Sequence, residues 1–444
     1  MTVRKQIHLA VHVPGTDDTV RSDPRSGSPA EFASFVHLAR TAERGLFDFL
    51  LVAEGLRLPE HKGRIHDLDV VGRPEPLTLL SALAAVTERL GLAAGACTAF
   101  HEPYELARRL ATLDHLSGGR AAWNAVTSPD ARTAENFRRL GHPDPAGPPE
   151  APDSAGTVRD PLARATEFVQ VARELWDSWT PDGTPRPFAH QGRHFDIAGE
   201  FTVPRAPQGH PVVIGSADSP QEREFAASAA DVVLTRHGTP EESRALHADV
   251  KGRLAAYGRA PQDLRIMPGV SVVLGDTAAE AQERAATARR QRTSPRHAIV
   301  ALERIWGVDL SAYDPDGPLP DIDPDPGSTL VRDRARAAEL LAVAEKWRTL
   351  SREKGLSIRQ TVIEASARQS FVGTPQAVAD ELGELVRTDA ADGFVLIPHP
   401  TPGGLDEFVD RVVPLLQERG TFRTEYTGTT LRSHLGLPEP VWKG

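Results

Sequence analysis

The chain has 444 residues, of which 40% are hydrophobic and 25% are charged. This composition supports a large folded core and excludes a wholly disordered protein. The formal net charge of −10 gives no general attraction to nucleic acids or anionic membranes, and we expect neither as a partner. The single cysteine, Cys97, excludes an internal disulfide and a cysteine-ligated zinc cluster, and we expect no metal site.

The N-terminal residues lack the apolar stretch and cleavage site of a signal peptide. The longest apolar run, from Leu77 to Val86, is about half as long as a transmembrane helix needs. We therefore expect a soluble, cytoplasmic protein.

Short apolar runs alternate with longer helical patterns along the chain. The runs span residues 7–13, 47–53, 90–98, 120–126, 212–215, 231–234, 266–274 and 393–398. Strands that alternate with helices predict βαβ units and a parallel sheet. Eight such units are the number in a (β/α)8 TIM barrel, so we predict an α/β fold of this type with insertions.

Helix starts support this prediction. A serine or threonine three residues before a glutamate, at Ser28, Ser219, Thr239 and Thr277, has the spacing of a capping box. A further helix is predicted over residues 161–179 from the spacing of its apolar side chains.

Three stretches do not fit the alternation. Residues 127–158 are rich in proline, glycine and aspartate, residues 180–210 predict an irregular strand pair, and residues 293–358 hold a proline-rich loop before a helical pattern. We predict one domain over residues 1–444 with these stretches as insertions. In a barrel, long insertions usually build the rim of the active site or an oligomer surface.

Functional groups in such a barrel lie at the carboxyl ends of the strands and in the loops that follow. The polar residues at these positions are His12, Glu54, Thr98, His101, Asn124, Thr127, Ser128, Ser216 and Ser219. Together they predict a polar-rimmed pocket for a phosphate-bearing ligand, because a helix that starts at a serine also binds phosphate. Structural alternatives stay open for four of them: a solvated loop carboxylate for Glu54, a satisfied strand end for Thr98, a helix cap for Ser219 and a core histidine for His12.

Residues 73–128 carry the most specific motifs, LDHLSGGR and then WNAVTS, followed by Asn136 and Phe137. Further matches are PQGHPVVI at 207–214, GTPQAVADEL at 373–382 and the stretch 412–438. The chain resembles the luciferase-like flavin monooxygenases over nearly its whole length. Within that family it resembles the branch of the nitrilotriacetate, dibenzothiophene-sulfone and long-chain alkane monooxygenases.

This resemblance implies an enzyme that oxygenates a small organic substrate with O2 and reduced FMN (FMNH2). A separate NAD(P)H-dependent flavin reductase is implied as the partner that supplies the reduced flavin. It also implies association into homodimers or homotetramers. The substrate stays open, since members oxidise aminopolycarboxylates, sulfones, sulfonates and alkanes.

The resemblance also assigns flavin contacts. Glu54, where the family usually has aspartate, corresponds to a residue at the edge of the isoalloxazine ring. Thr98 matches the threonine that ends the third strand, and Asn124, Thr127 and Ser128 match the motif beside the flavin.

Ser219 matches the serine that binds the FMN phosphate, and Ser216 lies in the loop before it. His12 is the candidate catalytic residue, as a proton or hydrogen-bond donor to the peroxide of the reduced flavin, because imidazole titrates near neutral pH.

Two departures weaken this phosphate site. Val158 and Leu162 stand where the family usually has a histidine and a tyrosine, and Glu222 stands where it has a glycine. Arg159, Arg223 and His142 are candidates for compensation. Two alternatives therefore stay open: an oxidoreductase that uses the deazaflavin F420, and a barrel that has lost flavin affinity and acts as a binding protein.

Overall fold

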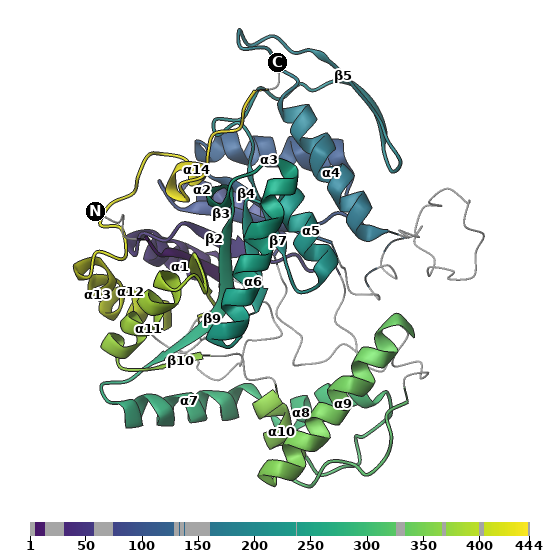
Figure 1. Cartoon of the computed structure of the whole chain (residues 1–444), viewed down its shortest axis with the longest axis vertical. Coiled ribbons are helices and arrows are strands. Elements are labelled where there is room, and N and C mark those ends of the chain that lie inside the picture. The colour runs from purple at the N-terminus through teal and green to yellow at the C-terminus, as the bar shows by residue number, and fades with distance from the viewer. Residues whose placement is uncertain are drawn as a thin grey trace.

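The computed structural model describes residues 5–13, 31–56, 74–127, 133, 137, 160–236, 238–325, 334–365, 370–398 and 404–442. Within these residues, eight parallel strands close into a barrel, which confirms the predicted fold (Figure 1). They are β1 (His8–Val13), β2 (Phe49–Val52), β3 (Gly91–Cys97), β4 (Ala121–Val126), β7 (Val212–Ser216), β8 (Val232–Arg236), β9 (Arg265–Leu274) and β11 (Gly393–Leu396). The strands pair in this order, and β11 pairs back onto β1 to close the ring.

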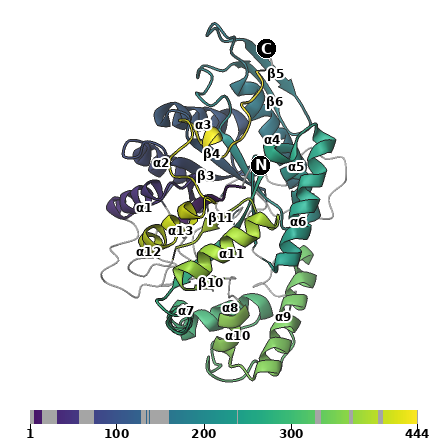
Figure 2. The same ribbon diagram turned by 60° about the vertical axis from the view of Figure 1, so that its left-hand side comes forward.

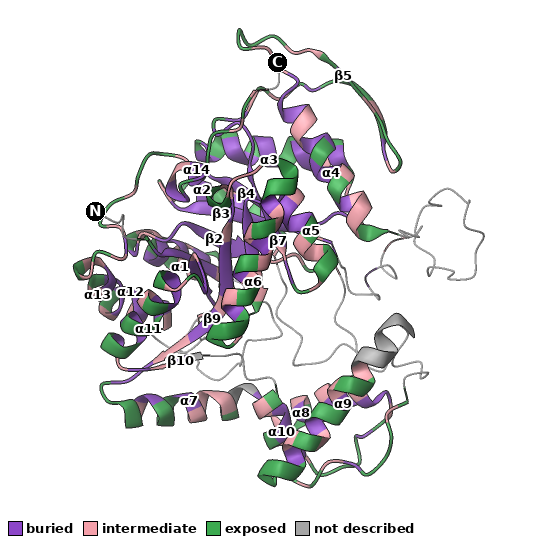
Figure 3. Cartoon of the chain, viewed as in Figure 1, coloured by how far each residue is buried: buried purple, intermediate pink, exposed green. Residues whose placement is uncertain are grey.

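Helices follow the strands and surround the barrel (Figure 2). They are α1 (Phe32–Arg44), α2 (Pro76–Ala84), α3 (Pro103–Ser117), α4 (Pro161–Trp176), α5 (Pro220–Ala229), α6 (Pro240–Arg253), α11 (Pro375–Arg387), α12 (Gly404–Arg411) and α13 (Val413–Glu418). Figure 3 shows buried strands and helices with one buried and one exposed face, as amphipathic helices on a sheet require. No helix in the described ranges is long and apolar enough to cross a membrane.

The helix starts were predicted with mixed success. The capping boxes at Ser219 and Thr239 are confirmed at the starts of α5 and α6. Thr277 caps its helix, but the partner carboxylate of Glu280 accepts from the Asp276 N–H instead of from Thr277. Residues 28–30 lie outside the described residues, and α1 begins at Phe32 without a side-chain cap.

A helical insertion separates β9 from β11. It contains α7 (Ala278–Arg292), α8 (Pro295–Trp306), α9 (Arg334–Lys354) and α10 (Ile358–Ala365), and the chain returns through β10 (Ser370–Gly373), which pairs with the end of β9. The insertion has its own apolar core, in which the rings of Trp306 and Trp347 lie 6.4 Å apart.

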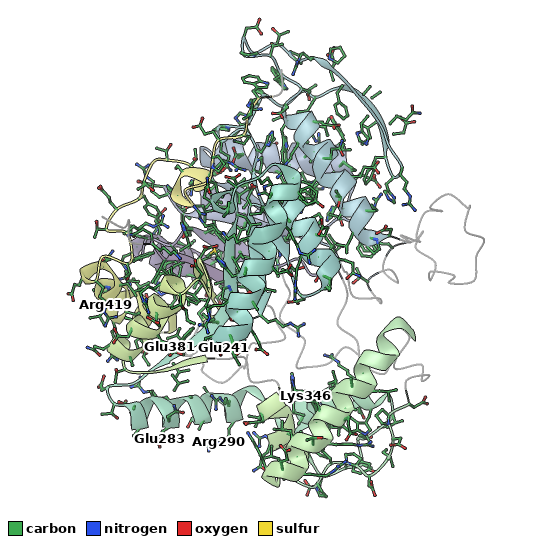
Figure 4. The ribbon with its side chains drawn as sticks, viewed as in Figure 1. Glu241, Glu283, Arg290, Lys346, Glu381 and Arg419 are labelled. Carbon is green, nitrogen blue, oxygen red and sulfur yellow. The ribbon has the colours of Figure 1, made fainter. Side chains whose placement is uncertain are left out.

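The insertion lies beyond the carboxyl ends of the barrel strands (Figure 1). Figure 4 shows Glu241, at the start of α6, on the barrel side, and Lys346 of α9 on the side of the insertion that faces the barrel. A second addition, between α4 and β7, is the antiparallel hairpin of β5 (Pro187–Gln191) and β6 (Asp196–Glu200), as predicted for residues 180–210. The description of residues 1–444 as one domain stays a prediction.

The C-terminal segment closes the opposite end of the barrel. Leu431 and Leu435, on and just after the short helix α14 (Leu431–His434), pack into the same apolar cluster as the inward-facing strand residues. Arg432 of α14 forms a buried ion pair with Asp231, which precedes β8 (3.1 Å). This plug leaves the carboxyl ends of the strands as the end at which a ligand site can be built.

Candidate active site

Three of the predicted site residues point into the barrel at the carboxyl ends of their strands. His12, Asn124 and Ser216 are half-buried near the ends of β1, β4 and β7. The residues two positions before them belong to the interior apolar cluster: Ala10, Ala122 and Ile214. Because side chains alternate along a strand, His12, Asn124 and Ser216 lie on the same interior face, just beyond this apolar floor.

Glu54 follows β2 and joins the end of that strand to the end of β3. Its Oε2 accepts a hydrogen bond from the Cys97 N–H (2.8 Å), and its Oε1 lies 2.7 Å from Nε2 of His101. The side chains of Glu54 and His101 are only 9% and 16% exposed. The structure therefore excludes the alternative that Glu54 is a solvated loop carboxylate. It also shows that His101, which was predicted only to lie in the loop after β3, is a direct partner of Glu54.

The close approach of Glu54 to β3 depends on Gly95. A Cβ atom at Gly95 would lie 2.9 Å from the backbone nitrogen of Glu54. A larger residue at this position would push the carboxylate away from its two donors.

Thr98 and Thr127 are buried where β3 and β4 end. The Thr98 hydroxyl donates to the carbonyl of Val126 (3.3 Å), and the Thr98 N–H donates to the same carbonyl (3.0 Å). This hydroxyl therefore satisfies a strand end, which was the structural alternative. Ser128, like His142, Val158 and Arg159, lies outside the described residues.

Arg164, which was not among the predicted site residues, fixes the loop after β3. Arg164, in the first turn of α4, donates to the carbonyls of Thr98 and His101, each at 3.3 Å. Its guanidinium carbon lies 4.3 Å from the ring centre of Phe195, in the turn of the β5–β6 hairpin. Nothing local marks this arginine in the sequence, because its partners are backbone carbonyls about sixty residues earlier.

The start of α5 holds the predicted phosphate site. Ser219 caps the helix by accepting from the Glu222 N–H (3.2 Å), and Glu222 Oε2 accepts from the Ser219 N–H (2.9 Å). Glu222 Oε1 also accepts from the hydroxyl of Ser216 (3.1 Å). The N–H of the predicted phosphate ligand Ser219 and the hydroxyl of the neighbouring Ser216 therefore already donate to a carboxylate of the same chain.

The motif LDHLSGGR lies at the other end of the barrel. The buried Asp114 accepts from the Ala121 N–H (3.0 Å) and from the side chain of Gln208 (2.5 Å), and burial raises its pKa to about 6. The guanidinium of Arg120 donates to the carbonyls of Leu90 (2.8 Å) and Thr87 (2.9 Å). This part of the motif organises the start of β4, and only the following WNAVTS stretch leads to the site.

The thiol of Cys97 is buried, and this burial raises its pKa to about 11. It is therefore protonated at neutral pH and is a poor nucleophile. Within the described part of the chain, no group of three or more histidine, cysteine, aspartate or glutamate side chains is arranged to hold a metal ion.

A closed parallel barrel with inward-facing polar groups at the carboxyl ends of its strands is the architecture of a (β/α)8-barrel enzyme. The model of the luciferase-like monooxygenase family matches residues 15–392. The chain therefore belongs to this family and is an oxidoreductase, as its motifs predicted.

Individual relatives cover almost the whole chain. N-acetyl-S-(2-succino)cysteine monooxygenase of Bacillus subtilis (strain 168) is 38% identical, over 99% of this chain and 98% of that protein. Nitrilotriacetate monooxygenase component A of Aminobacter aminovorans is also 38% identical, over 91% and 90% of the two chains. Among solved structures, riboflavin lyase with modified FMN and riboflavin superposes with a TM-score of 0.75 at 26% identity, covering 98% and 97%.

Proposed function

We propose that this chain is the oxygenase component of a two-component, FMNH2-dependent monooxygenase. It oxygenates a small organic substrate with O2, and a separate NAD(P)H-dependent reductase supplies the reduced FMN. The observation that carries this proposal is the set of half-buried polar side chains on the interior face of the barrel, in a chain of this family. The name component A of the nitrilotriacetate relative supports a second component, and the riboflavin lyase structure supports FMN.

The two ends of a flavin do not fit the site equally well. The ring end fits, because hydrogen-bonding groups rise from an apolar floor, as they do in cofactor sites generally. The phosphate end fits poorly, because the carboxylate of Glu222 lies at the start of α5 and already accepts from the Ser216 hydroxyl and the Ser219 N–H. When bound, reduced flavin supplies the electrons that activate O2.

In this proposal, the chain's own residues position the ring and handle a proton. Glu54, held by the Cys97 N–H and His101, faces the edge of the ring. Asn124 and Thr127 lie beside it, while Thr98 supports the strand ends. The role of Ser128, which is outside the described residues, stays an assignment from the motif.

His12, at the end of β1, donates a proton or a hydrogen bond at the reacting centre, since an imidazole titrates near neutral pH. We expect the protein to act as a cytoplasmic homodimer or homotetramer.

The test combines the purified chain with FMN, a flavin reductase, NADH and ¹⁸O2. Candidate substrates come from the aminopolycarboxylates, sulfones, sulfonates and alkanes. We expect one ¹⁸O atom in the product, and a loss of about 10²-fold or more in kcat for His12→Ala. Affinity for reduced F420 without affinity for FMNH2 would instead support the deazaflavin alternative, and affinity for neither would support the non-catalytic barrel.

A further inference from the structure

The carboxylate of Glu222 occupies the anion-binding position at the start of α5. The ten-residue helix begins after Ser219, and its first turn presents N–H groups that have no partner within the helix. One oxygen of Glu222 accepts from the Ser219 N–H (2.9 Å), and the other accepts from the Ser216 hydroxyl (3.1 Å). These are groups that would otherwise face a bound phosphate.

Neighbouring arginines are engaged with other carboxylates. Arg223 donates to Asp249 of α6 (2.9 Å) and to the carbonyl of Ala217 (3.3 Å). Arg236, at the end of β8, forms an ion pair with Asp218 (3.3 Å). The Arg236 side chain is 89% exposed, so of the two only Arg223 is held close to the barrel. Glu222 itself is the acidic residue in the first turn of α5 and compensates the positive end of the helix dipole.

A dianionic phosphate at this position would have to displace Glu222. The displacement breaks the capping box and the hydrogen bond from Ser216, and it leaves two anions close together. A neutral hydroxyl at the end of a ribityl chain meets no such repulsion, and it can donate a hydrogen bond to the Glu222 carboxylate.

We propose that Glu222 is a specificity-determining residue that removes the preference of this site for phosphorylated flavin. The chain then takes up flavin through its ring and ribityl chain, and riboflavin binds at least as well as FMN. This inference rests on the proposed function, since it assumes that a flavin occupies the barrel.

The test measures the dissociation constants of FMN and riboflavin, oxidised and anaerobically reduced, by fluorescence titration. For the unaltered chain, we expect the dissociation constant of riboflavin to be no more than roughly threefold above that of FMN. Glu222→Gly should shift their ratio toward FMN by about tenfold or more, and Glu222→Gln by a smaller factor, because it removes the charge but keeps an acceptor.

Glu242→Gly is the matched control. Glu242 closes the same capping box with Thr239 at the start of α6, with the same 2.9 Å and 3.2 Å distances. This variant should lose a similar amount of helix stability, measured by thermal unfolding. The ratio of the two dissociation constants should stay unchanged. If Glu222→Gly folds poorly, Glu222→Gln still provides the comparison with the unaltered chain.

The inference is overturned if the unaltered chain prefers FMN by tenfold or more, or if both Glu222 variants leave the ratio unchanged while flavin still binds. If neither flavin binds to the unaltered chain or to any variant, the proposed function is overturned and the inference with it.

Discussion

The carboxylate of Glu54 and the imidazole of His101 meet at 2.7 Å across the ends of two neighbouring strands. The second oxygen of Glu54 is held by the Cys97 N–H. Because both oxygens have partners and both side chains are largely buried, the carboxylate has a fixed orientation. Fixed polar groups of this kind position a cofactor without a cost in reorganisation.

We therefore predict that Glu54→Ala reduces turnover more than it reduces stability. The loss of two hydrogen bonds should destabilise the fold by about 1–3 kcal/mol, whereas kcat/KM should fall by at least about tenfold. Glu43→Ala is the control, because Glu43 accepts from three backbone N–H groups, of Glu88, Arg89 and Leu90, at the other end of the barrel. Equal proportional losses of activity and melting temperature in both variants would contradict the assignment.

The C-terminal plug should contribute strongly to the stability of the barrel. Leu435 is fully buried in the interior cluster, whereas Leu116 of α3 is 62% exposed. Leu435→Ala should therefore cost about 2–5 kcal/mol, and Leu116→Ala less than about 0.5 kcal/mol, in denaturant unfolding. If the two leucines gave the same small change, the plug would not be part of the cooperative core.

Periodicity and capping signals were sufficient to predict the barrel. Each of the eight apolar runs corresponds to one strand, and the serine–proline and threonine–proline starts mark α5 and α6. The plug could not be predicted in the same way. Arg432 and Asp231 are about two hundred residues apart, and a four-residue helix has no period of its own.

The sequence was sufficient to predict which candidate site residues lie at strand ends, but not which residues their side chains contact. The positions of His12, Asn124 and Ser216 follow from the strand pattern. The partners of Glu54 depend on the register between β2 and β3, which brings Val52 beside Ala94. Arg164 gave no signal, because an arginine near a helix start usually faces solvent.

Acid should weaken the fold partly through Asp48. Burial opposes ionisation of this carboxyl, but Arg423 and His8 outweigh it and lower its pKa to about 2. An unfolded aspartate titrates near pH 3.9, so between these values the folded state binds fewer protons than the unfolded state. Asp48 thus contributes about 2 kcal/mol above pH 4, and this is lost as the pH falls toward 2.

We expect Asp48→Asn to be less stable than the unaltered chain at pH 7, and to lose less stability between pH 4 and pH 2. Urea unfolding at closely spaced pH values measures both effects. Asp389→Asn serves as the control, because the ion pair of Asp389 with Lys5 is exposed and contributes little. An Asp48→Asn curve parallel to that of the unaltered chain would show that Asp48 does not carry this acid dependence.

Arg164 should act on flavin binding through the loop it holds. Its guanidinium donates to the carbonyls of Thr98 and His101, so it positions the residue that holds Glu54. Lysine keeps the charge but lacks the planar fork that reaches both carbonyls. We expect Arg164→Lys to weaken flavin affinity by about three- to tenfold, with a melting temperature close to that of the unaltered chain.

Arg173→Lys, on the same helix, is the control. It removes a donor to the carbonyl of Ala229 and should lower the melting temperature without a selective effect on flavin. Fluorescence titration and thermal unfolding of both variants separate these effects, and a loss of flavin affinity in Arg173→Lys equal to that in Arg164→Lys would refute the positioning role.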